Sequence, residues 1–267
     1  MASTILGIVN ITEDSFSDGG RYLETIAAID HAHELAMDGA DVLDLGAASS
    51  NIDSTPVPPE VEIARLAPLV EALHKDGRVL SIDSFSTPVQ RWALEQGVAY
   101  LNDIQGFADP ALYPDLARSP ARLILMHSVQ GRGKATETDV APAEIYDRVV
   151  HFFEQRIAAL TMAGVARDRL ILDPGMGFFL SSNPETSLEV LRRLPDLKAH
   201  FGLPVLIGVS RKSFLRRITN RQTSDCGAVT LAAELFAASA GADYIRTHDA
   251  ACLADGLKFW QAAAGSQ

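Results

Sequence analysis

Two short segments in the last third of the chain place cations beside hydroxyl groups. They read Ser-Arg-Lys-Ser over residues 210–213 and Arg-Thr-His-Asp over residues 246–249. Arginine binds a phosphate group through two parallel N–H donors, and lysine adds a compact charge, so both segments suit an anionic ligand. A pair such as Arg211-Lys212, taken alone, more often forms surface ion pairs, and only its position in the fold can favour the functional interpretation.

Hydrogen-bond acceptors follow apolar runs earlier in the chain. Asp83, Asn102 and Asp173 each come at the end of such a run. Two carboxylates and an amide can hydrogen-bond the edge of a flat heterocycle that carries several N–H donors. Each of these residues alone could simply form a turn, as Asp and Asn commonly do after strands. Several polar groups that meet at one rim would be difficult to explain by turns alone.

Residues so far apart in sequence can meet only if the fold brings the ends of several strands together. Eight short apolar runs alternate with helix-period stretches, and several of these stretches end in a glycine-containing turn. This alternation predicts an α/β fold, a parallel sheet closed into a TIM (β/α)₈ barrel as a single domain. The expected strands are 5–9, 42–45, 79–82, 100–101, 123–126, 170–172, 205–208 and 244–245, and the expected helices include 26–37, 61–74, 142–162, 187–200 and 227–240.

Barrels of this kind gather their active sites at the carboxyl ends of the strands. The acceptors fall on the third, fourth and sixth expected strands, and the cations follow the seventh and eighth. The last two strand ends form the usual phosphate corner of such barrels, and a helix beginning near Ser213 would add backbone N–H donors. This position favours an anion site for Arg211, Lys212 and Arg246. The glycine patterns GxGxxG and GxxxxGKS do not occur.

Composition excludes several classes of function. With 47% hydrophobic and 21% charged residues, the chain has the balance of a globular protein. A net charge of −11 argues against nucleic-acid binding, which needs a clustered basic surface. The sequence has neither an apolar stretch long enough for a membrane span nor the features of a signal peptide, so we expect no membrane partner. Cys226 and Cys252 form no CxxC motif, which fits a reducing compartment, and we expect a cytoplasmic protein.

Six short motifs, in order and at matching spacing, resemble the dihydropteroate synthases nearly end to end. The resemblance implies one pterin-binding barrel over residues 1–267. It also implies the condensation of 6-hydroxymethyl-7,8-dihydropterin diphosphate with p-aminobenzoate, giving 7,8-dihydropteroate and diphosphate in folate biosynthesis. Residues 7–20 (GIVNITEDSFSDGG) look like the family's first strand and mobile first loop. The motifs are 81–84 (SIDS), 102–104 (NDI), 126–127 (MH), 173–178 (DPGMGF), 210–213 (SRKS) and 246–249 (RTHD).

The resemblance also implies roles for individual residues. Mg²⁺ held by Asn10 would bridge the diphosphate, and Asp18 lies on the first loop, which in this family closes over the substrates. The implied mechanism is dissociative, so it needs no nucleophilic side chain. The implied pterin contacts are Asp83, Asn102, Met126, Asp173 and Lys212; the diphosphate contacts are Asn10, Arg246 and His248; the aminobenzoate contacts are Ser50, Phe178, Phe179, Arg211 and Ser213; the catalytic residues are Asp18, Asp83, Asp173 and Lys212.

Two segments depart from the family pattern on the expected amine-binding side. Residues 48–53 read ASSNID where the family commonly has Glu-Ser-Thr-Arg-Pro-Gly, so Asn51 replaces the arginine. After Phe178 the chain has Phe179 and Leu180 instead of Gly and Lys. These changes resemble the sulfonamide-insensitive branch carried on resistance elements. Our hypothesis is that the Phe179 ring excludes the bulky sulfonyl group; the alternative is that it packs against the barrel wall.

Other interpretations stay open at this point. His127 fits a hydrogen-bonded structural histidine better than a general base. A pterin-binding methyltransferase barrel or a non-catalytic pterin-binding module would keep the acidic contacts but would not need the basic corner. A Schiff-base aldolase would use Lys212. Family likeness suggests a homodimer, for which the apolar residues of 253–260 could supply an interface or only core.

Overall fold

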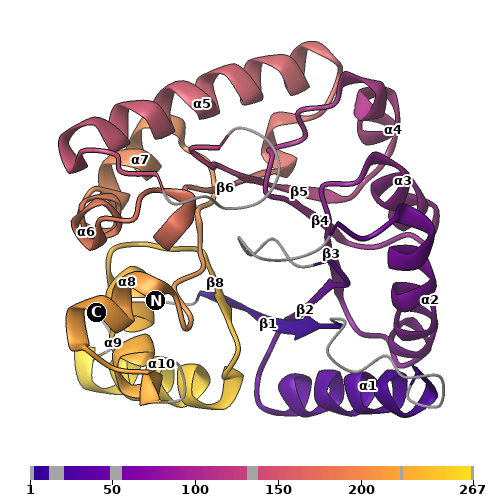
Figure 1. The fold of residues 1–267 in the computed structure, drawn as a ribbon, viewed down its shortest axis with the longest axis horizontal. Helices are drawn as coiled ribbons and strands as arrows, with labels where there is room; N and C mark the ends of the chain where they lie inside the picture. The colour runs from indigo at the N-terminus through magenta and orange to yellow at the C-terminus, as the bar shows by residue number, and fades with distance from the viewer. Residues whose placement is uncertain (1–2, 12–20, 49–55, 131–137, 223–224, 266–267) are drawn as a thin grey trace.

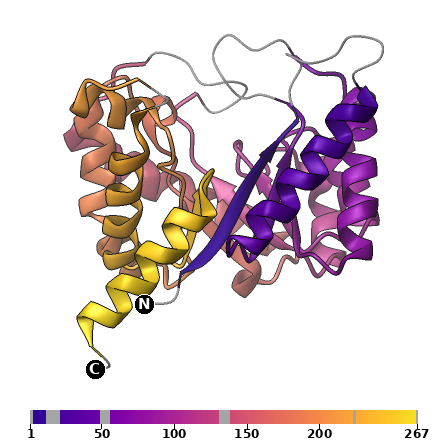
Figure 2. The ribbon, with the colours of Figure 1, turned by 90° about the horizontal axis from the view of Figure 1, so that it is seen from below.

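Eight parallel strands lie at the centre of the molecule, and helices surround them (Figure 1). The computed structural model describes residues 3–11, 21–48, 56–130, 138–222 and 225–265. Figure 2 shows the helices packed around the strands from the side. The strands are β1 (Thr4–Asn10), β2 (Val42–Gly46), β3 (Leu80–Asp83), β4 (Tyr100–Asp103), β5 (Arg122–Met126), β6 (Leu170–Asp173), β7 (Leu206–Ile207) and β8 (Tyr244–Thr247).

The strands form a nearly closed barrel. Their order is β6-β5-β4-β3-β2-β1-β8-β7, and every paired neighbour is parallel. The two ends of this order meet where the backbone N–H of Leu172 donates to the Pro204 carbonyl at 2.9 Å and Leu172 forms a bridge with Val205. Closure matters because an open sheet would expose unpaired backbone groups at its edges. The predicted (β/α)₈ architecture is confirmed.

The helices begin and end where the sequence supplies the appropriate residue types. Several start with proline in the first turn, where a missing N–H costs nothing. Gly39, Gly97, Gly164 and Gly241 follow helices with positive φ, as the glycine-containing turns predicted. The helices are α1 (Arg21–Met37), α2 (Pro59–Lys75), α3 (Thr87–Glu95), α4 (Tyr113–Arg118), α5 (Pro142–Met162), α6 (Pro184–Arg192), α7 (Leu194–Phe201), α8 (Ser213–Thr219), α9 (Gly227–Ser239) and α10 (Ala250–Ala264), with short 3₁₀ helices η2 (Pro110–Leu112), η3 (Arg167–Arg169) and η4 (Gly177–Phe179).

The expected helix over residues 187–200 is wrong as a single element. The chain forms α6 and α7 instead, with Arg193 between them in a non-helical conformation. Pro195 is the physical reason, because inside a continuous helix its ring would clash with the preceding turn and remove a hydrogen bond. At the second position of α7 the same residue is tolerated.

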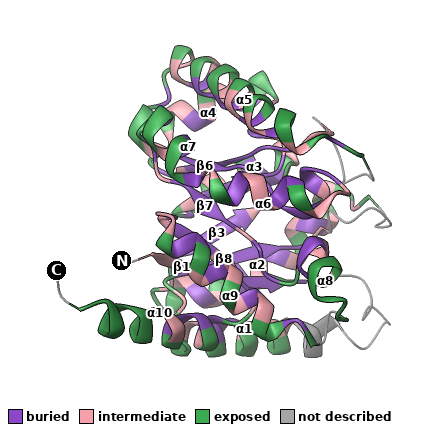
Figure 3. Ribbon diagram, turned by 90° about the vertical axis from the view of Figure 1, so that its left-hand side faces the viewer, coloured by how far each residue is buried: buried purple, intermediate pink, exposed green. Residues whose placement is uncertain are grey.

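Two apolar layers build the core. A large layer lies between strands and helices, and Figure 3 shows the buried strands inside the more exposed outer helices. A smaller cluster fills the barrel itself at the amino-terminal ends of its strands, where Tyr100 and Tyr244 pack edge to face with centroids 6.3 Å apart. This inner cluster closes that end of the barrel, and it consists of Leu6, Val42, Ile124, Ile171, Leu206 and Tyr244, with Tyr100 against it.

Among the described residues, no helix combines the length and the apolar character that crossing a bilayer requires.

Candidate active site

A layer of polar side chains follows the apolar cluster inside the barrel. Side chains alternate across a strand, so a residue two positions further along points the same way. Two positions after five of the seven residues of the inner cluster comes a polar residue or methionine. On five strands the pairs are Val42 and Asp44, Tyr100 and Asn102, Ile124 and Met126, Ile171 and Asp173, and Tyr244 and Arg246. The predicted acceptors therefore reach the barrel interior one layer towards the carboxyl ends.

Arg246 lies between two carboxylates within this layer. Its Nε is 2.5 Å from Asp44 Oδ2, and its Nη2 is 2.7 Å from Asp83 Oδ2. The Arg246 side chain is 18% exposed and that of Asp44 is 0% exposed. The Asn102 amide also donates to Asp44 Oδ2 at 3.3 Å. Asp44 is thus a site residue that sequence reasoning did not select, although it is the one acid in the apolar segment 42–46.

Burial shifts the pKa values of the ionisable side chains in this layer towards 7. Burial raises the pKa of Asp83 to about 7 although Arg246 opposes it, and it raises the pKa of Asp173 to about 6 although the Gly175 N–H opposes it. Burial also lowers the pKa of Lys212 to about 8, with Arg246 contributing, while both carboxylates oppose the change. Perturbed acids and a perturbed lysine in one cluster are typical of functional sites.

Several buried atoms of the layer have unused hydrogen-bonding capacity. Asp44 Oδ1, Ser81 Oγ and Asn102 Oδ1 have no hydrogen-bond partner among the described residues. Buried polar groups in folded proteins are nearly always paired, so such atoms call for a ligand or water. Because all of them can accept, they suit a ligand that presents N–H groups.

The loop after β6 lies close to the end of β5. Gly175 has φ +75°, and a Cβ there would lie 2.4 Å from the His127 carbonyl oxygen, so only glycine allows this approach. His127 is buried, its Nδ1 is 3.1 Å from the Pro174 carbonyl, and burial lowers its pKa to about 4. These contacts agree with the expected structural role of His127.

Phe178 and Phe179 occupy different surroundings within η4. Phe179 is buried and packs with Ile104 and Met126, and the Lys212 Nζ is 4.9 Å from its ring centroid. Phe178 is partly buried, and the Arg217 guanidinium is 5.5 Å from its ring. Phe179 thus contacts residues expected to bind the pterin, in addition to lying beside Phe178.

The ends of β7 and β8 form the basic corner. Lys212 directly precedes α8, which begins at Ser213 as predicted. Arg211 has an exposed side chain and an unusual positive φ of 58°, and its N–H donates to Thr230 Oγ1 at 3.4 Å. His248 Nδ1 lies 2.9 Å from Ser210 Oγ. Burial, together with the nearby cations, lowers the pKa of His248 to about 3, so this histidine is neutral at pH 7.

Asn10 is exposed at the end of β1 and is a candidate metal ligand. An added Cβ at Gly46 would lie 3.5 Å from Asn10 Oδ1, which locates this amide beside the end of β2. Among the described residues, no group of three His, Cys, Asp or Glu side chains could hold a metal. One amide oxygen is compatible with Mg²⁺ that keeps waters and binds substrate phosphates. Asp18 and Ser50 lie outside the described residues.

Comparison with known proteins agrees with this geometry. Residues 6–248 match the family model described as pterin binding enzyme. The chain is 58% identical to dihydropteroate synthase type-2 of Escherichia coli over 253 residues, which cover 95% of this chain and 93% of that protein.

Solved structures agree as well. A dihydropteroate synthase of Xanthomonas albilineans solved with 4-aminobenzoic acid has a TM-score of 0.89 and 37% identity, covering 99% of this chain and 94% of that chain. The same enzyme in complex with 7,8-dihydropteroate has a TM-score of 0.85 and 35% identity, covering 99% and 95%. The chain therefore belongs to the pterin-binding enzyme family and, within it, to the dihydropteroate synthases.

Proposed function

We propose that this chain condenses 6-hydroxymethyl-7,8-dihydropterin diphosphate with p-aminobenzoate, yielding 7,8-dihydropteroate and diphosphate. One observation carries the proposal: a buried layer of acids and an amide lies inside the barrel beside the Arg246 guanidinium. The acids suit the N–H groups of a pterin ring, and the cations at the ends of β7 and β8 suit its diphosphate. Substrate-like and product-like ligands of the structural relatives support it.

Asp83, Asn102, Asp173 and Lys212 bind the pterin in this proposal. Ionised Asp173 and Asp83 accept hydrogen bonds from ring N–H groups, and Asn102 can both donate and accept. Lys212 donates to an oxygen or nitrogen of the ring. Met126 supplies an apolar contact at the end of β5, where it packs with Ile104 and Phe179.

Departure of diphosphate is the step for which the basic corner is suited. The C–O bond to the pterin methylene breaks, the electron pair leaves with the diphosphate, and Arg246 and His248 hold the departing anion. Asp83 and Asp173 stabilise the delocalised pterin cation that remains. The amine of p-aminobenzoate then forms the new C–N bond and releases one N–H proton to solvent, with Phe178, Phe179, Arg211 and Ser213 beside it. Ser50 and Asp18 complete the amine side and the closing first loop in this proposal.

Mg²⁺ is the proposed metal. It would be held by Asn10 together with water and the diphosphate oxygens, and when bound it would neutralise charge on the leaving group. The protein contributes only a neutral ligand among its described residues, so binding of the metal should depend on the diphosphate. The proposal also includes a cytoplasmic location and a homodimer.

Phe179 is the proposed cause of sulfonamide resistance. Its ring is 7% exposed and packs on Met126 beside Lys212, a position from which it narrows the space next to the amine site. A steric clash with the sulfonyl group of only a few kcal/mol would discriminate about 100-fold against the inhibitor. The type-2 designation of the E. coli relative is consistent with a resistance enzyme.

A diphosphate-release assay tests both parts. The wild-type chain is incubated with dihydropterin diphosphate and p-aminobenzoate, with and without Mg²⁺ and sulfamethoxazole. We expect release that requires both substrates and persists with the sulfonamide, whereas Phe179→Gly should become sensitive by about 100-fold. Absence of release would instead favour a methyltransferase barrel or a non-catalytic pterin-binding module. Unchanged resistance in the Phe179→Gly variant would show that this ring only packs against the barrel.

A further inference from the structure

A buried hydroxyl group that the proposed reaction does not use holds His248. Ser210 follows β7 and is 5% exposed. Its Oγ accepts the backbone N–H of His248 at 3.2 Å and lies 2.9 Å from Nδ1 of the same residue. One serine therefore contacts both the backbone and the ring of His248 and joins the ends of β7 and β8.

The proton inventory of these contacts selects one tautomer of His248. A serine hydroxyl has one proton to donate and can accept two hydrogen bonds. The backbone N–H of His248 can only donate, so Ser210 Oγ accepts there. Among the described residues, the only other partner of Oγ is His248 Nδ1. A proton on Nδ1 would leave the buried hydroxyl proton without an acceptor, which is costly. With the ring proton on Nε2, every one of these groups is satisfied.

The tautomer matters because His248 is neutral. Burial lowers its pKa to about 3, and the charges of Arg211, Arg246 and Lys212 contribute to that shift. A neutral imidazole has a single N–H, so the nitrogen that carries it decides whether the ring attracts or repels an anion. His248 Nε2 has no hydrogen-bond partner among the described residues, so it is available to a ligand.

Helix α9 supports the same corner from outside the barrel. Thr230 accepts the Arg211 N–H, and Glu234, one turn later on the helix, lies beside the Thr247 side chain. Both strand ends are thus held on the side away from the barrel interior. The Ser210–His248 contact is part of a supported arrangement and not an isolated surface contact.

We propose that Ser210 is a positioning residue for the leaving diphosphate: its hydroxyl donates to Nδ1 and so fixes His248 as an Nε2–H donor to the diphosphate oxygens. This inference rests on the proposed function, because it requires an oxyanion beside His248. Ser210 itself does not contact the substrate. Ser210 acts through His248: it determines whether the Nε2 atom of the neutral ring presents an N–H group or a lone pair to the anion.

The first test is an NMR measurement on the ligand-free, full-length protein labelled with ¹⁵N at histidine. The His248 signals are identified by their absence from the His248→Ala spectrum. We expect the wild type to show the Nε2–H tautomer and Ser210→Ala to show a mixture or the Nδ1–H form. An unchanged tautomer in Ser210→Ala would overturn the inference without affecting the proposed function.

The second test measures binding of two matched ligands, dihydropterin diphosphate and the corresponding hydroxymethyl-dihydropterin without diphosphate. Ser210→Ala should weaken only the diphosphate ligand, by roughly tenfold, the factor of one hydrogen bond to a charged group. Ser210→Thr, which keeps a hydroxyl, should restore tight binding. Ser119→Ala removes a serine bond to a backbone N–H before β5, at the opposite end of the barrel, and should leave both affinities unchanged.

A double variant separates positioning from general damage. In a His248→Ala background, Ser210→Ala should cause no further loss, because its effect passes through that ring. Additive losses, or equal losses for both ligands, would contradict the inference. If the wild type itself bound both ligands equally, the proposed function would fail, and the NMR result would still decide the tautomer.

Discussion

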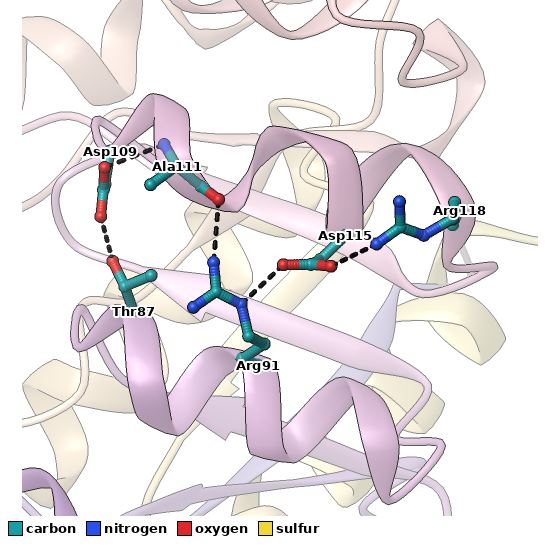
Figure 4. Close-up of polar contacts among 6 residues, drawn as sticks. All are labelled: Thr87, Arg91, Asp109, Ala111, Asp115 and Arg118. Atoms are coloured by element: carbon teal, nitrogen blue, oxygen red, sulfur yellow. Dashed lines mark hydrogen bonds and ion pairs between the residues drawn. The ribbon is translucent and has the colours of Figure 1, made fainter.

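Two clusters in this molecule pair arginine with aspartate, but the pKa of the aspartate shifts in opposite directions in the two. On the outer helices, Arg91 of α3 contacts Asp115 of α4 at 2.7 Å, and Arg118 contacts the same carboxylate at 2.6 Å (Figure 4). Inside the barrel, Arg246 contacts Asp44 and Asp83 at similar distances. The arginines stabilise the charge of Asp115 and lower its pKa, whereas burial raises the pKa of Asp83 to about 7 despite Arg246.

Solvent exposure explains the difference. The Arg91 side chain is 45% exposed, whereas Asp44 is 0% exposed. An exposed pair gives up little hydration, so it costs little and contributes little. A buried group of charges loses much hydration and is retained at a cost in stability. The outer cluster ties α3 to α4, and the inner cluster holds charged groups that can bind a ligand.

Removing the arginine from each cluster should give the largest difference in stability between the buried and the exposed ion pairs. Arg246→Gln should destabilise the protein by about 3–5 kcal/mol, because two buried carboxylates lose their partner. Arg91→Gln should cost under about 1 kcal/mol. Urea denaturation measures both values. Similar losses of unfolding free energy in the two variants would mean that burial does not make the inner ion pairs more important for stability than the surface pairs.

Replacing one acid in each region should change stability in opposite directions. Asp173→Asn removes a buried charge while keeping an acceptor for the Gly175 N–H, and we expect about 1–2 kcal/mol of added stability at pH 8. Diphosphate release should fall at least ~100-fold. Asp115→Asn should slightly lower stability and leave turnover unchanged. A destabilised Asp173→Asn protein would show that this carboxylate supports the fold as well as the reaction.

The smallest expected effect is a pH dependence of pterin binding. The pKa of Asp173 is raised to about 6 in the folded protein, so the acid takes up a proton as the pH falls below that value and stops accepting ring N–H groups. Protonation of Asp173 should therefore reduce the affinity for hydroxymethyl-dihydropterin about tenfold by pH 5, relative to the ionised protein. Because the pKa of Asp83 is raised to about 7, its protonation should begin to weaken binding at higher pH. Titration calorimetry measures it. The Asp173→Asn variant should bind weakly with a flatter profile, and an equally steep profile would assign the titration to another group.

The sequence predicted the barrel well because its strands are buried on both faces and therefore read as apolar runs. It predicted β4 and β8 too short, since Asn102-Asp103 and Arg246-Thr247 are polar residues that still belong to strands. Asn102 and Arg246 are polar because they reach the site, whereas Asp103 and Thr247 alternate to the other face of the sheet.

The predicted site residues that lie within the described chain gather at the carboxyl ends of the strands, but two supporting residues were missed. Asp44 acquires its role from Arg246, 202 positions later, and Ser210 from His248. No local pattern encodes such a partnership, because it arises only when the barrel closes. A single acid in an apolar strand, at the interior-facing position, was the available signal for Asp44.

The apolar cluster inside the barrel affects how substrates and product enter and leave the site. Among the described residues, Tyr100, Tyr244 and their neighbours fill the amino-terminal end of the barrel, so a ligand reaches Asn102 from the carboxyl ends of the strands, where Phe179 and the basic corner lie. A pterin bound to the deeper acids cannot dissociate while p-aminobenzoate is bound nearer the carboxyl ends of the strands. This arrangement predicts ordered binding, in which the pterin substrate binds before p-aminobenzoate and dihydropteroate is the last product to dissociate.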